Sequence, residues 1–311
     1  MSQTEDYNQL FDNNDQFEQE AESALGDLMT DAEEAPTMAF AMQLDRIDQA
    51  GGTDTGRRRH NEDYFGIQTQ IRQDVSPQGA TTQVRGLYIV CDGMGGHSAG
   101  EVASTMAVEI LQRYFETHWQ EELPNEETIR EGILLANQKI HEVNQEKSRS
   151  GAGRMGTTLV MALVQDTQVA IAHVGDSRVY QVNRYGDLFQ LTVDHEVGQR
   201  EIAKGVAPEE AYNLSNAYQL TQALGPRPNS KVNPDIQYLE IQEDSLILLC
   251  SDGLSDGELL ETHAETGLMP LLQSKTNLEK GLLDLIHLAK EKRGHDNITG
   301  VAIRLKLRPV N

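Results

Sequence analysis

The pattern of hydrophobic and polar positions changes near residue 46 of this 311-residue chain. Residues 1–45 are rich in Asp, Glu, Gln and Asn and poor in β-branched residues. Such a composition buries too little apolar surface to offset the entropy lost on ordering. We therefore predict a disordered acidic N-terminal extension over 1–45 and a folded domain over 46–308.

Within the folded part, the apolar runs have two kinds of periodicity. Short runs rich in β-branched residues predict strands at 64–70, 86–91, 157–164, 168–174, 178–182, 236–241, 245–250 and 298–305. Apolar residues at i, i+4 spacing predict helices at 98–118, 126–147 and 278–292. Two helices run in succession and several strands follow them, unlike the regular alternation of a parallel sheet. This order favours an α+β layered fold with antiparallel sheets.

The segment 195–235 differs from its surroundings. It has little apolar periodicity and is interrupted by glycines and prolines, so we interpret it as an irregular insertion. Long loops of this kind are often functional lids.

Charge is distributed unevenly along the chain. The sequence has 49 acidic and 26 basic residues, and residues 1–50 contain 13 of the acidic residues and a single basic one. Nucleic-acid binding needs clustered Lys and Arg, so we expect no nucleic-acid partner. An anionic membrane surface is an equally poor partner for so acidic a chain. The acidic segment could instead cover a cationic site as a weak competitive inhibitor, or recruit a basic partner.

Cysteine content and the N-terminal sequence narrow the class further. The two cysteines, Cys91 and Cys250, cannot form a disulfide framework or a four-cysteine zinc site, and we interpret them as small buried hydrophobic residues. The N-terminus has no basic region followed by an apolar one, as a signal peptide would. No run approaches the roughly 20 apolar residues of a membrane helix. We expect a cytoplasmic protein.

Two apolar runs end in an Asp-Gly pair. Asp92 follows 87–91 and Asp252 follows 246–250. If these strands are neighbours, both carboxylates emerge at one edge of the core, where their repulsion is severe without a cation. The glycine after Asp92, Gly93, lets the backbone come close enough for its carbonyl to act as a ligand.

More carboxylates stand beside predicted strands. Glu62 and Asp63 open one strand, and Asp296 precedes the last. A single Asp-Gly pair is usually a turn, but several carboxylates beside core strands indicate a polynuclear site. Hard divalent cations, which prefer oxygen ligands, are the natural occupants.

Six short motifs occur in one order along the chain. They are R-x-x-N-E-D (58–63), D-G-M-G-G-H (92–97), M-G-T-T (155–158), G-D-S-R (175–178), S-D-G-L (251–254) and D-N (296–297). In order and rough spacing, from about Asp48 to Leu305, they resemble the bacterial form of the metal-dependent protein phosphatase 2C family. The resemblance implies a four-layer α-β-β-α sandwich of two antiparallel sheets flanked by helices. It also implies hydrolysis of phosphoserine and phosphothreonine in proteins, with two core Mn²⁺ or Mg²⁺ ions and a third, weaker one.

The resemblance also implies roles for individual residues. Asp92 would bridge the two core ions, and Gly93 would supply its carbonyl oxygen. Asp252 and Asp296 would complete the shell of the first ion, and Asp176 would hold the third ion. Glu62 and Asp63 would bind metal directly or through ordered waters. Arg58, flanked by Arg57 and Arg59, would grip the substrate phosphate, since its planar fork matches phosphate bidentately. Two metals about 3.5–4 Å apart lower the pKa of a bridging water toward neutrality.

Met94 departs from many eukaryotic members of that family, which have a histidine there, proposed as general acid. Methionine cannot donate a proton, so protonation of the leaving group would fall to a metal-bound water or to another residue such as His97. Segment 195–235 matches the family's variable flap beside the active site.

Three functions remain open on this sequence. The first is an active serine/threonine phosphatase, a monomer whose partners are phosphorylated proteins and opposing kinases. The second is a catalytically silent regulatory module on the same fold. The third is a metal-dependent hydrolase of small phosphate esters.

Overall fold

The computed structural model describes residues 41–76, 79–95, 99–146 and 154–310. Most of the predicted N-terminal extension lies outside these residues. The first strand, β1 (Met42–Asp54), begins before residue 46, so the folded part includes four of the positions assigned to the extension. From Met42 onward the described residues form one compact unit.

Ten strands build two large antiparallel sheets. Sheet A has the strand order β1-β12-β11-β8-β9, and sheet B has β10-β7-β6-β3-β2. After β1, sheet A consists of β12 (Ile298–Pro309), β11 (Ser245–Cys250), β8 (Arg178–Asn183) and β9 (Leu188–Gln190). Sheet B consists of β10 (Asp235–Glu240), β7 (Gln168–Val174), β6 (Leu159–Gln165), β3 (Gly79–Cys91) and β2 (Tyr64–Ser76). A short ribbon pairs β4 (Gly93–Met94) with β5 (Gly156–Thr157).

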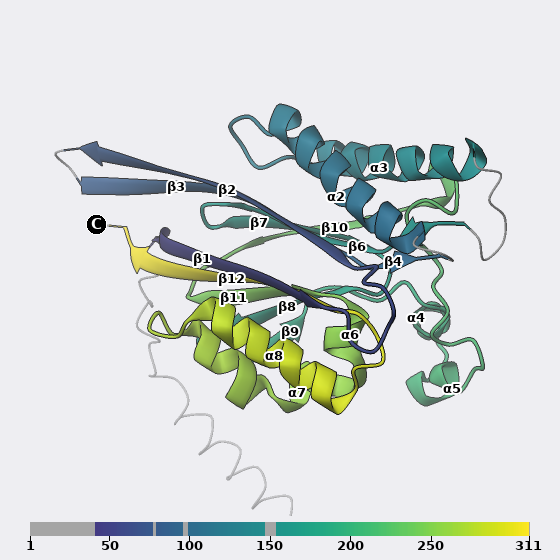
Figure 1. Cartoon of the computed structure of the whole chain (residues 1–311). Helices are drawn as coiled ribbons and strands as arrows, with labels where there is room; N and C mark the ends of the chain where they lie inside the picture. The colour runs from purple at the N-terminus through teal and green to yellow at the C-terminus, as the bar shows by residue number, and fades with distance from the viewer. Residues whose placement is uncertain (1–40, 77–78, 96–98, 147–153, 311) are drawn as a thin grey trace, which may run out of the picture. The chain divides into compact units, whose positions relative to one another are not determined.

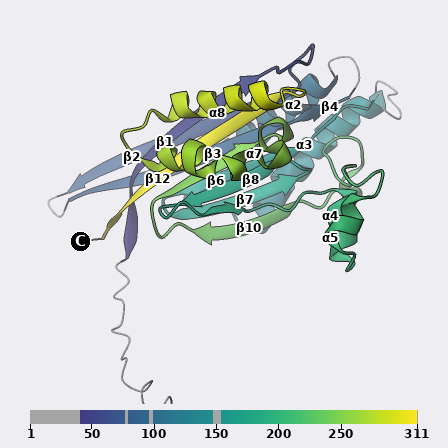
Figure 2. The ribbon, with the colours of Figure 1, turned by 90° about the horizontal axis from the view of Figure 1, so that it is seen from below.

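Helices cover the outer faces of the two sheets. The long helices α2 (Ala99–His118) and α3 (Glu126–Glu146) lie over sheet B, and α8 (Leu278–Lys292) lies over sheet A (Figure 1). The view from below shows α8 and the short α7 (Leu259–Thr262) across the strands of sheet A (Figure 2). No described helix is long and apolar enough to cross a bilayer.

Strand alternation explains how each sheet packs on both faces. In β3, Ile89 belongs to the apolar cluster that contains Leu111 of α2 and Ile133 of α3, whereas Tyr88 and Val90 belong to the cluster between the sheets. Successive side chains of a strand point to opposite faces, so one strand serves both layers.

Sheet A repeats this arrangement on the other side. Leu248 of β11 joins Leu282 of α8 in a third cluster, and Ile247 and Leu249 face the space between the sheets. The architecture is therefore the expected four-layer α-β-β-α sandwich.

Three strands, β1, β4 and β9, and several helical turns are absent from the sequence prediction. In β1 a register shift lies between Leu44 and Arg46, and Asp48 forms an ion pair of 2.8 Å with the buried Arg304, so the strand lacks a regular apolar alternation. The strand β9 has only three residues, too few to show a strand pattern in the sequence. The predicted strand 157–164 is interrupted, since Thr158 lies between β5 and β6. Segment 195–235, expected to be irregular, contains α4 (Val197–Ala203) and α5 (Pro208–Tyr212).

Candidate metal centre

The predicted carboxylates are brought together where β3 and β11 end. Asp92 follows β3, and Asp252 follows β11 at the start of the short α6 (Asp252–Ser255). The two strands are not hydrogen-bonded neighbours, because β3 belongs to sheet B and β11 to sheet A. Asp63 lies beside the end of β3, since Tyr64 pairs with Cys91. Asp296 lies two residues before Ile298, the first residue of β12, and β12 pairs with β11.

Burial and mutual repulsion both act on the carboxylates of this cluster. Burial raises the pKa of Asp63 to about 7, with contributions from Asp252 and Asp296. Burial raises the pKa of Asp92 well above its usual range, and the nearby Asp63, Asp252 and Asp176 add to the rise. Burial and the neighbouring Asp256 and Asp296 raise the pKa of Asp252 to about 6. Carboxylates arranged in this way are not stable as anions without a positive charge among them.

Two carboxylate oxygens in the cluster lack any partner among the described residues. Asp63 Oδ1 and Asp252 Oδ1 are buried and accept no hydrogen bond. The other oxygen of Asp63 accepts from Ser251 Oγ at 2.8 Å, so only one side of this carboxylate is satisfied by protein. Buried polar atoms are normally hydrogen-bonded, and a hard cation is the partner that suits an all-oxygen donor set. The residues present therefore fit divalent metal ions.

The M-G-T-T motif fixes the backbone of Asp92. Thr158 N–H and Thr157 Oγ1–H both donate to Asp92 O, at 2.8 and 2.9 Å. Asp92 N–H in turn donates to Thr158 Oγ1 at 3.0 Å. These bonds set the direction in which the Asp92 side chain leaves the end of β3.

Gly93 packs too closely against its neighbours for any side chain. A Cβ there would lie 2.5 Å from Glu62 O and would overlap the backbone of Gly100. The Gly93 N–H donates to Glu62 O at 3.1 Å, and Gly100 N–H at the start of α2 donates to the Glu62 carboxylate. Burial raises the pKa of Glu62, which stands at the edge of the cluster.

Asn297 is a residue whose importance the sequence did not reveal. Its Oδ1 accepts from Glu62 N–H at 2.8 Å, and its Nδ2 donates to Thr55 O and His60 O at 2.9 Å each. It therefore holds the loop that carries Arg58, Glu62 and Asp63. Asn297 is part of the D-N motif, but a functional role was predicted only for Asp296 of that motif.

Arg58 lies at the rim of the cluster. Its guanidinium forms an ion pair of 2.5 Å with Asp296 Oδ2, and its Nε donates to His295 O at 3.1 Å. The side chain is 52% exposed, so the guanidinium remains accessible from solvent. Of the three consecutive arginines, it is Arg58 that reaches the carboxylates.

Asp176 lies in the turn after β7 and belongs to the same electrostatic group. Burial raises its pKa to about 8, and Asp252, Glu196 and Asp194 contribute. Ser177 next to it shares a hydrogen bond of 2.6 Å with Thr158, which links this turn to the residues that hold Asp92.

The sequence profile of protein phosphatase 2C matches residues 67–281. The chain belongs to the protein phosphatase 2C family. A serine/threonine phosphatase, stp, of Listeria monocytogenes is 36% identical over 262 residues, which cover 82% of this chain and 94% of that protein. These findings confirm the predicted family and enzyme class.

Solved structures of the family agree with the fold. The Mycobacterium tuberculosis serine/threonine phosphatase PstP/Ppp matches with a TM-score of 0.65 at 29% identity, covering 84% of this chain and 99% of that one. A PstP catalytic domain in complex with two manganese ions matches with a TM-score of 0.63 at 28% identity, covering 86% and 100%. The whole sandwich of this chain is thus similar to solved structures of 2C phosphatases, one of which contains two manganese ions.

Other family features are described only in part. Met94 lies in β4, but His97 lies outside the described residues, so no proton donor is assigned from this stretch. Cys91 and Cys250 are free and buried, and burial raises the pKa of the Cys250 thiol to about 12, in line with their interpretation as small hydrophobic residues.

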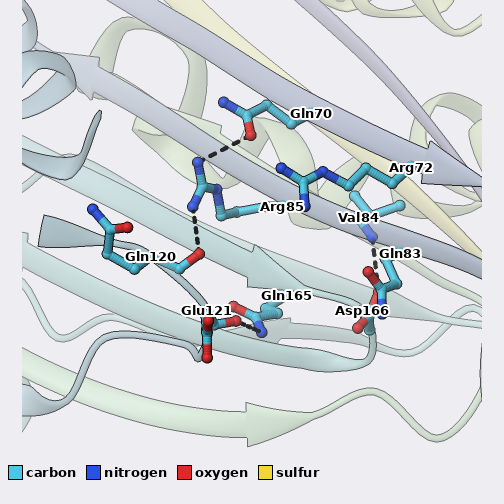
Figure 3. A pocket seen from close by; sticks show the side chains of 9 residues that line it. All are labelled: Gln70, Arg72, Gln83, Val84, Arg85, Gln120, Glu121, Gln165 and Asp166. Carbon is cyan, nitrogen blue, oxygen red and sulfur yellow. Dashed lines mark hydrogen bonds between the residues drawn. The ribbon is translucent and has the colours of Figure 1, made fainter. Parts of the chain in front are cut away.

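A cavity of about 290 Å³ lies elsewhere on this 2C phosphatase (Figure 3). It is lined by residues from the far half of the β2–β3 hairpin, such as Gln70 and Arg85, whereas Asp63 and Asp92 flank the opposite end of that hairpin. Arg85 donates to Gln70 Oε1 at 3.0 Å and to Gln120 O at 3.0 Å, and Val84 N–H donates to Asp166 Oδ1 at 2.8 Å. None of the clustered carboxylates lines this cavity.

Proposed function

We propose that this protein hydrolyses phosphoserine and phosphothreonine in proteins at the carboxylate cluster around Asp92. The observation that carries the proposal is a pair of buried oxygens, Asp63 Oδ1 and Asp252 Oδ1, that have no hydrogen-bond partner among the residues the structure describes. They lie in a group of mutually repelling carboxylates. When bound there, divalent ions would make a water nucleophilic near neutral pH and offset the charge of the phosphoryl group.

The proposed ligands follow from position in the cluster. Asp92 would be shared by two core ions, Gly93 would contribute its carbonyl, and Asp252 and Asp296 would hold the first ion. Glu62 and Asp63 would serve directly or through water, and Asp176 would hold a third ion. Mn²⁺ and Mg²⁺ both suit this all-oxygen donor set.

Arg58 is the proposed phosphate-binding residue. It is half-exposed at the rim, and its guanidinium is already directed at the cluster by His295 O and Asp296. An arginine fork binds two phosphate oxygens at once and so orients the phosphorus toward the centre. No cysteine or serine nucleophile is required.

The side chains around the cluster have supporting roles. Ser251 orients Asp63 through a bond of 2.8 Å, and Asn297 holds the loop of Arg58 against the sheet end. A rigid arrangement of this kind keeps charges in place for the transition state without reorganisation. Phosphorylated proteins are the implied substrates, and an opposing serine/threonine kinase the implied partner.

The proposal is tested by phosphate release from a phosphothreonine peptide with Mn²⁺, Mg²⁺ or EDTA. Wild type is compared with Asp252→Asn and with the matched control Asp284→Asn, an exposed aspartate on α8. We expect metal-dependent release that Asp252→Asn abolishes and Asp284→Asn retains. Folded protein that releases no phosphate with any metal would overturn the proposal in favour of a silent regulatory module.

The small-ester alternative has its own measurement. The ratio of kcat/KM for the phosphopeptide to that for p-nitrophenyl phosphate reports whether the enzyme uses the peptide around the phosphate. A ratio well above one supports a protein substrate, whereas a ratio at or below one favours a hydrolase of small esters.

A further inference from the structure

His195 contacts the turn that carries Asp176 through two separate groups. Gly175 N–H donates to His195 Nδ1 at 3.1 Å, and His195 N–H donates to Gly175 O at 2.9 Å. Gly175 has a φ of +112°, a conformation that L side chains rarely adopt. Both backbone groups of the residue before Asp176 are thus held by a single residue.

The hydrogen bonds of the His195 ring define its tautomer. A neutral imidazole has one donor and one acceptor nitrogen. Because Nδ1 accepts the Gly175 N–H, the ring proton is on Nε2. Asp235 Oδ2 lies 3.2 Å from Nε2 and accepts that proton's hydrogen bond. Asp235 therefore stabilises the tautomer that the contact with Gly175 requires.

His173 fixes the plane of the same ring. The two imidazoles stack with centroids 4.6 Å apart and an interplanar angle of 25°. His173 is itself buried and its Nε2–H donates to Val193 O at 2.9 Å. The His195 side chain is 10% exposed. Its ring is fixed by stacking on His173 and by hydrogen bonds at both of its nitrogens.

His173, His195 and Asp235 also have the spacing of a metal site, since their donor atoms lie within 4.8 Å of one another. His195 could coordinate a metal through Nε2 only if its proton moved to Nδ1, where the Gly175 N–H already points. The observed hydrogen bonds therefore favour a proton-bearing Nε2 over a metal-bound one.

The backbone of His195 reaches further into segment 195–235. His195 O accepts from Thr221 N–H at 2.7 Å and from Thr221 Oγ1 at 2.9 Å. Asp235 begins β10, so His195 and Asp235 close the two ends of this segment against each other. The preceding residue, Asp194, forms a bidentate ion pair with Arg178, on the other side of Asp176.

We propose that His195 and Asp235 are a positioning pair that sets Asp176 through Gly175 and so couples segment 195–235 to the third metal ion. This inference rests on the proposed function, which assigns Asp176 to that ion. Because coupling between two sites is reciprocal, binding of the third ion at Asp176 also restrains the base of segment 195–235.

The first test reads the tautomer without any metal. Long-range ¹H–¹⁵N correlation spectra of the full chain in EDTA should give a His195 ring with the proton on Nε2. In Asp235→Ala this preference should weaken, and in Asp235→Asn, which keeps an acceptor oxygen, it should be retained. A wild-type ring protonated on Nδ1 would overturn the proposal whatever the enzyme's activity.

The second test counts Mn²⁺ ions by EPR titration. His195→Gln retains a donor that reaches Asp235 but removes the acceptor for Gly175, and should weaken the weakest ion about 10-fold while the two tighter ions are unchanged. Asp235→Ala should weaken it by a smaller factor, and the control Asp284→Ala should leave all ions unchanged. Equal affinities in wild type and His195→Gln would overturn the proposal.

Asp176→Asn separates this inference from the assignment beneath it. If Asp176→Asn removes the weakest ion but His195→Gln does not weaken it, positioning fails and the proposed metal site stands. If Asp176→Asn removes no ion, the assignment of Asp176 fails and the coupling with it. One Zn²⁺ bound per chain and lost in His173→Ala would instead establish a separate metal site and overturn the hydrogen-bond role of His195.

Discussion

The two ends of the β2–β3 hairpin use polar residues in opposite ways. At the Asp63–Asp92 end, carboxylates are buried together, and two of their oxygens have no partner within the described part of the chain. At the other end, the side chains around the cavity of Figure 3 bond one another, as Arg85 does with Gln70. The side chains around the cavity already have partners, whereas the other end has buried oxygens that a cation can bind. Incomplete hydrogen bonding of buried groups is therefore the sign of function at this end of the hairpin.

The largest effect is expected from Asp92→Asn, which removes one charge from the centre of the cluster. Loss of a shared ligand should reduce kcat/KM for a phosphopeptide by about 1,000-fold, or ~4 kcal/mol of transition-state stabilisation. Phosphate release at saturating Mn²⁺ measures this. Activity within tenfold of wild type would show that Asp92 is not at the centre of the chemistry.

Arg58→Ala should have the next largest effect. Losing the bidentate contact is expected to lower kcat/KM about 10–100-fold, while Mn²⁺ binding stays intact because Arg58 is not a ligand. Arg58→Lys keeps the charge but not the planar fork, and should recover only part of the loss. A variant that loses Mn²⁺ instead of phosphate affinity would contradict this assignment.

The metal-free protein should lose stability as pH rises. Burial raises the pKa of Asp63 from its ordinary value of 3.8 to about 7, so the folded state binds this proton more tightly. Its contribution to stability is complete below about pH 3.8 and is lost as pH rises through about 7. Thermal unfolding in EDTA should give a Tm that falls from pH 5 to 8 more steeply in wild type than in Asp63→Asn.

Saturating Mn²⁺ is the control for that measurement. A cation offsets the repulsion between the carboxylates, so the difference in slope between wild type and Asp63→Asn should shrink when it is bound. Parallel curves for the two proteins in EDTA would mean that Asp63 does not carry this dependence.

Arg85→Ala tests the satisfied end of the hairpin. The guanidinium bonds to Gln120 O and Gln70 and lies 5.4 Å from the ring of Trp119, so its loss should cost about 1–3 kcal/mol of unfolding free energy. Activity at 25 °C should be unchanged. Arg72→Ala, an exposed arginine that lines the same cavity, is the matched control and should be nearly neutral. A fall in kcat/KM with Arg85→Ala would show that this end of the hairpin also contributes to catalysis, against the proposed difference between the two regions.

Removal of residues 1–40 should have the smallest effect. The deletion stops before β1, which begins at Met42, and takes away most of the acidic excess of the N-terminal segment. We expect kcat to stay constant and KM to change only at low salt, because exposed charges are screened within about 10 Å at 0.1 M salt. If the deletion variant and the full chain have the same KM at low salt as well as at high salt, these charges have no part in substrate binding.

The sequence predicted some elements well because their signal is local. Strand 245–250 is a continuous apolar run buried on both faces, and helix 278–292 has an apolar stripe, so the predicted bounds match β11 and α8. In β1, by contrast, the Asp48–Arg304 pair satisfies a charge that looks incompatible with a core strand. Its partner lies at the far end of the chain, and no local pattern contains that information.

The candidate site likewise has features that the sequence predicted and features that it did not. The carboxylates were predictable from the motifs, and the structure places Asp63, Asp92, Asp176, Asp252 and Asp296 in one electrostatic cluster. It was not predictable that the strands before Asp92 and Asp252 lie in different sheets, since an Asp-Gly pair after a strand does not indicate which strand lies opposite. The bond from Gly175 to His195 was equally hidden, because it depends on how β7 and the following segment fold back on each other.

The pairing of β1 with β12 has a consequence for the order in which the protein is made. The first strand of the domain pairs along its length with the last, from Met42 opposite Pro309 to Asp54 opposite Ile298. β1 is the edge strand of sheet A and has no other strand partner in that sheet, so during synthesis both of its edges stay unpaired until nearly all of the domain has left the ribosome. Asp296 and Asn297 arrive with that last strand, so a nascent chain lacks both a proposed metal ligand and the residue that holds the Arg58 loop. Phosphatase activity should accordingly begin only with the completed chain, and truncations that remove β12 should yield no partly active enzyme.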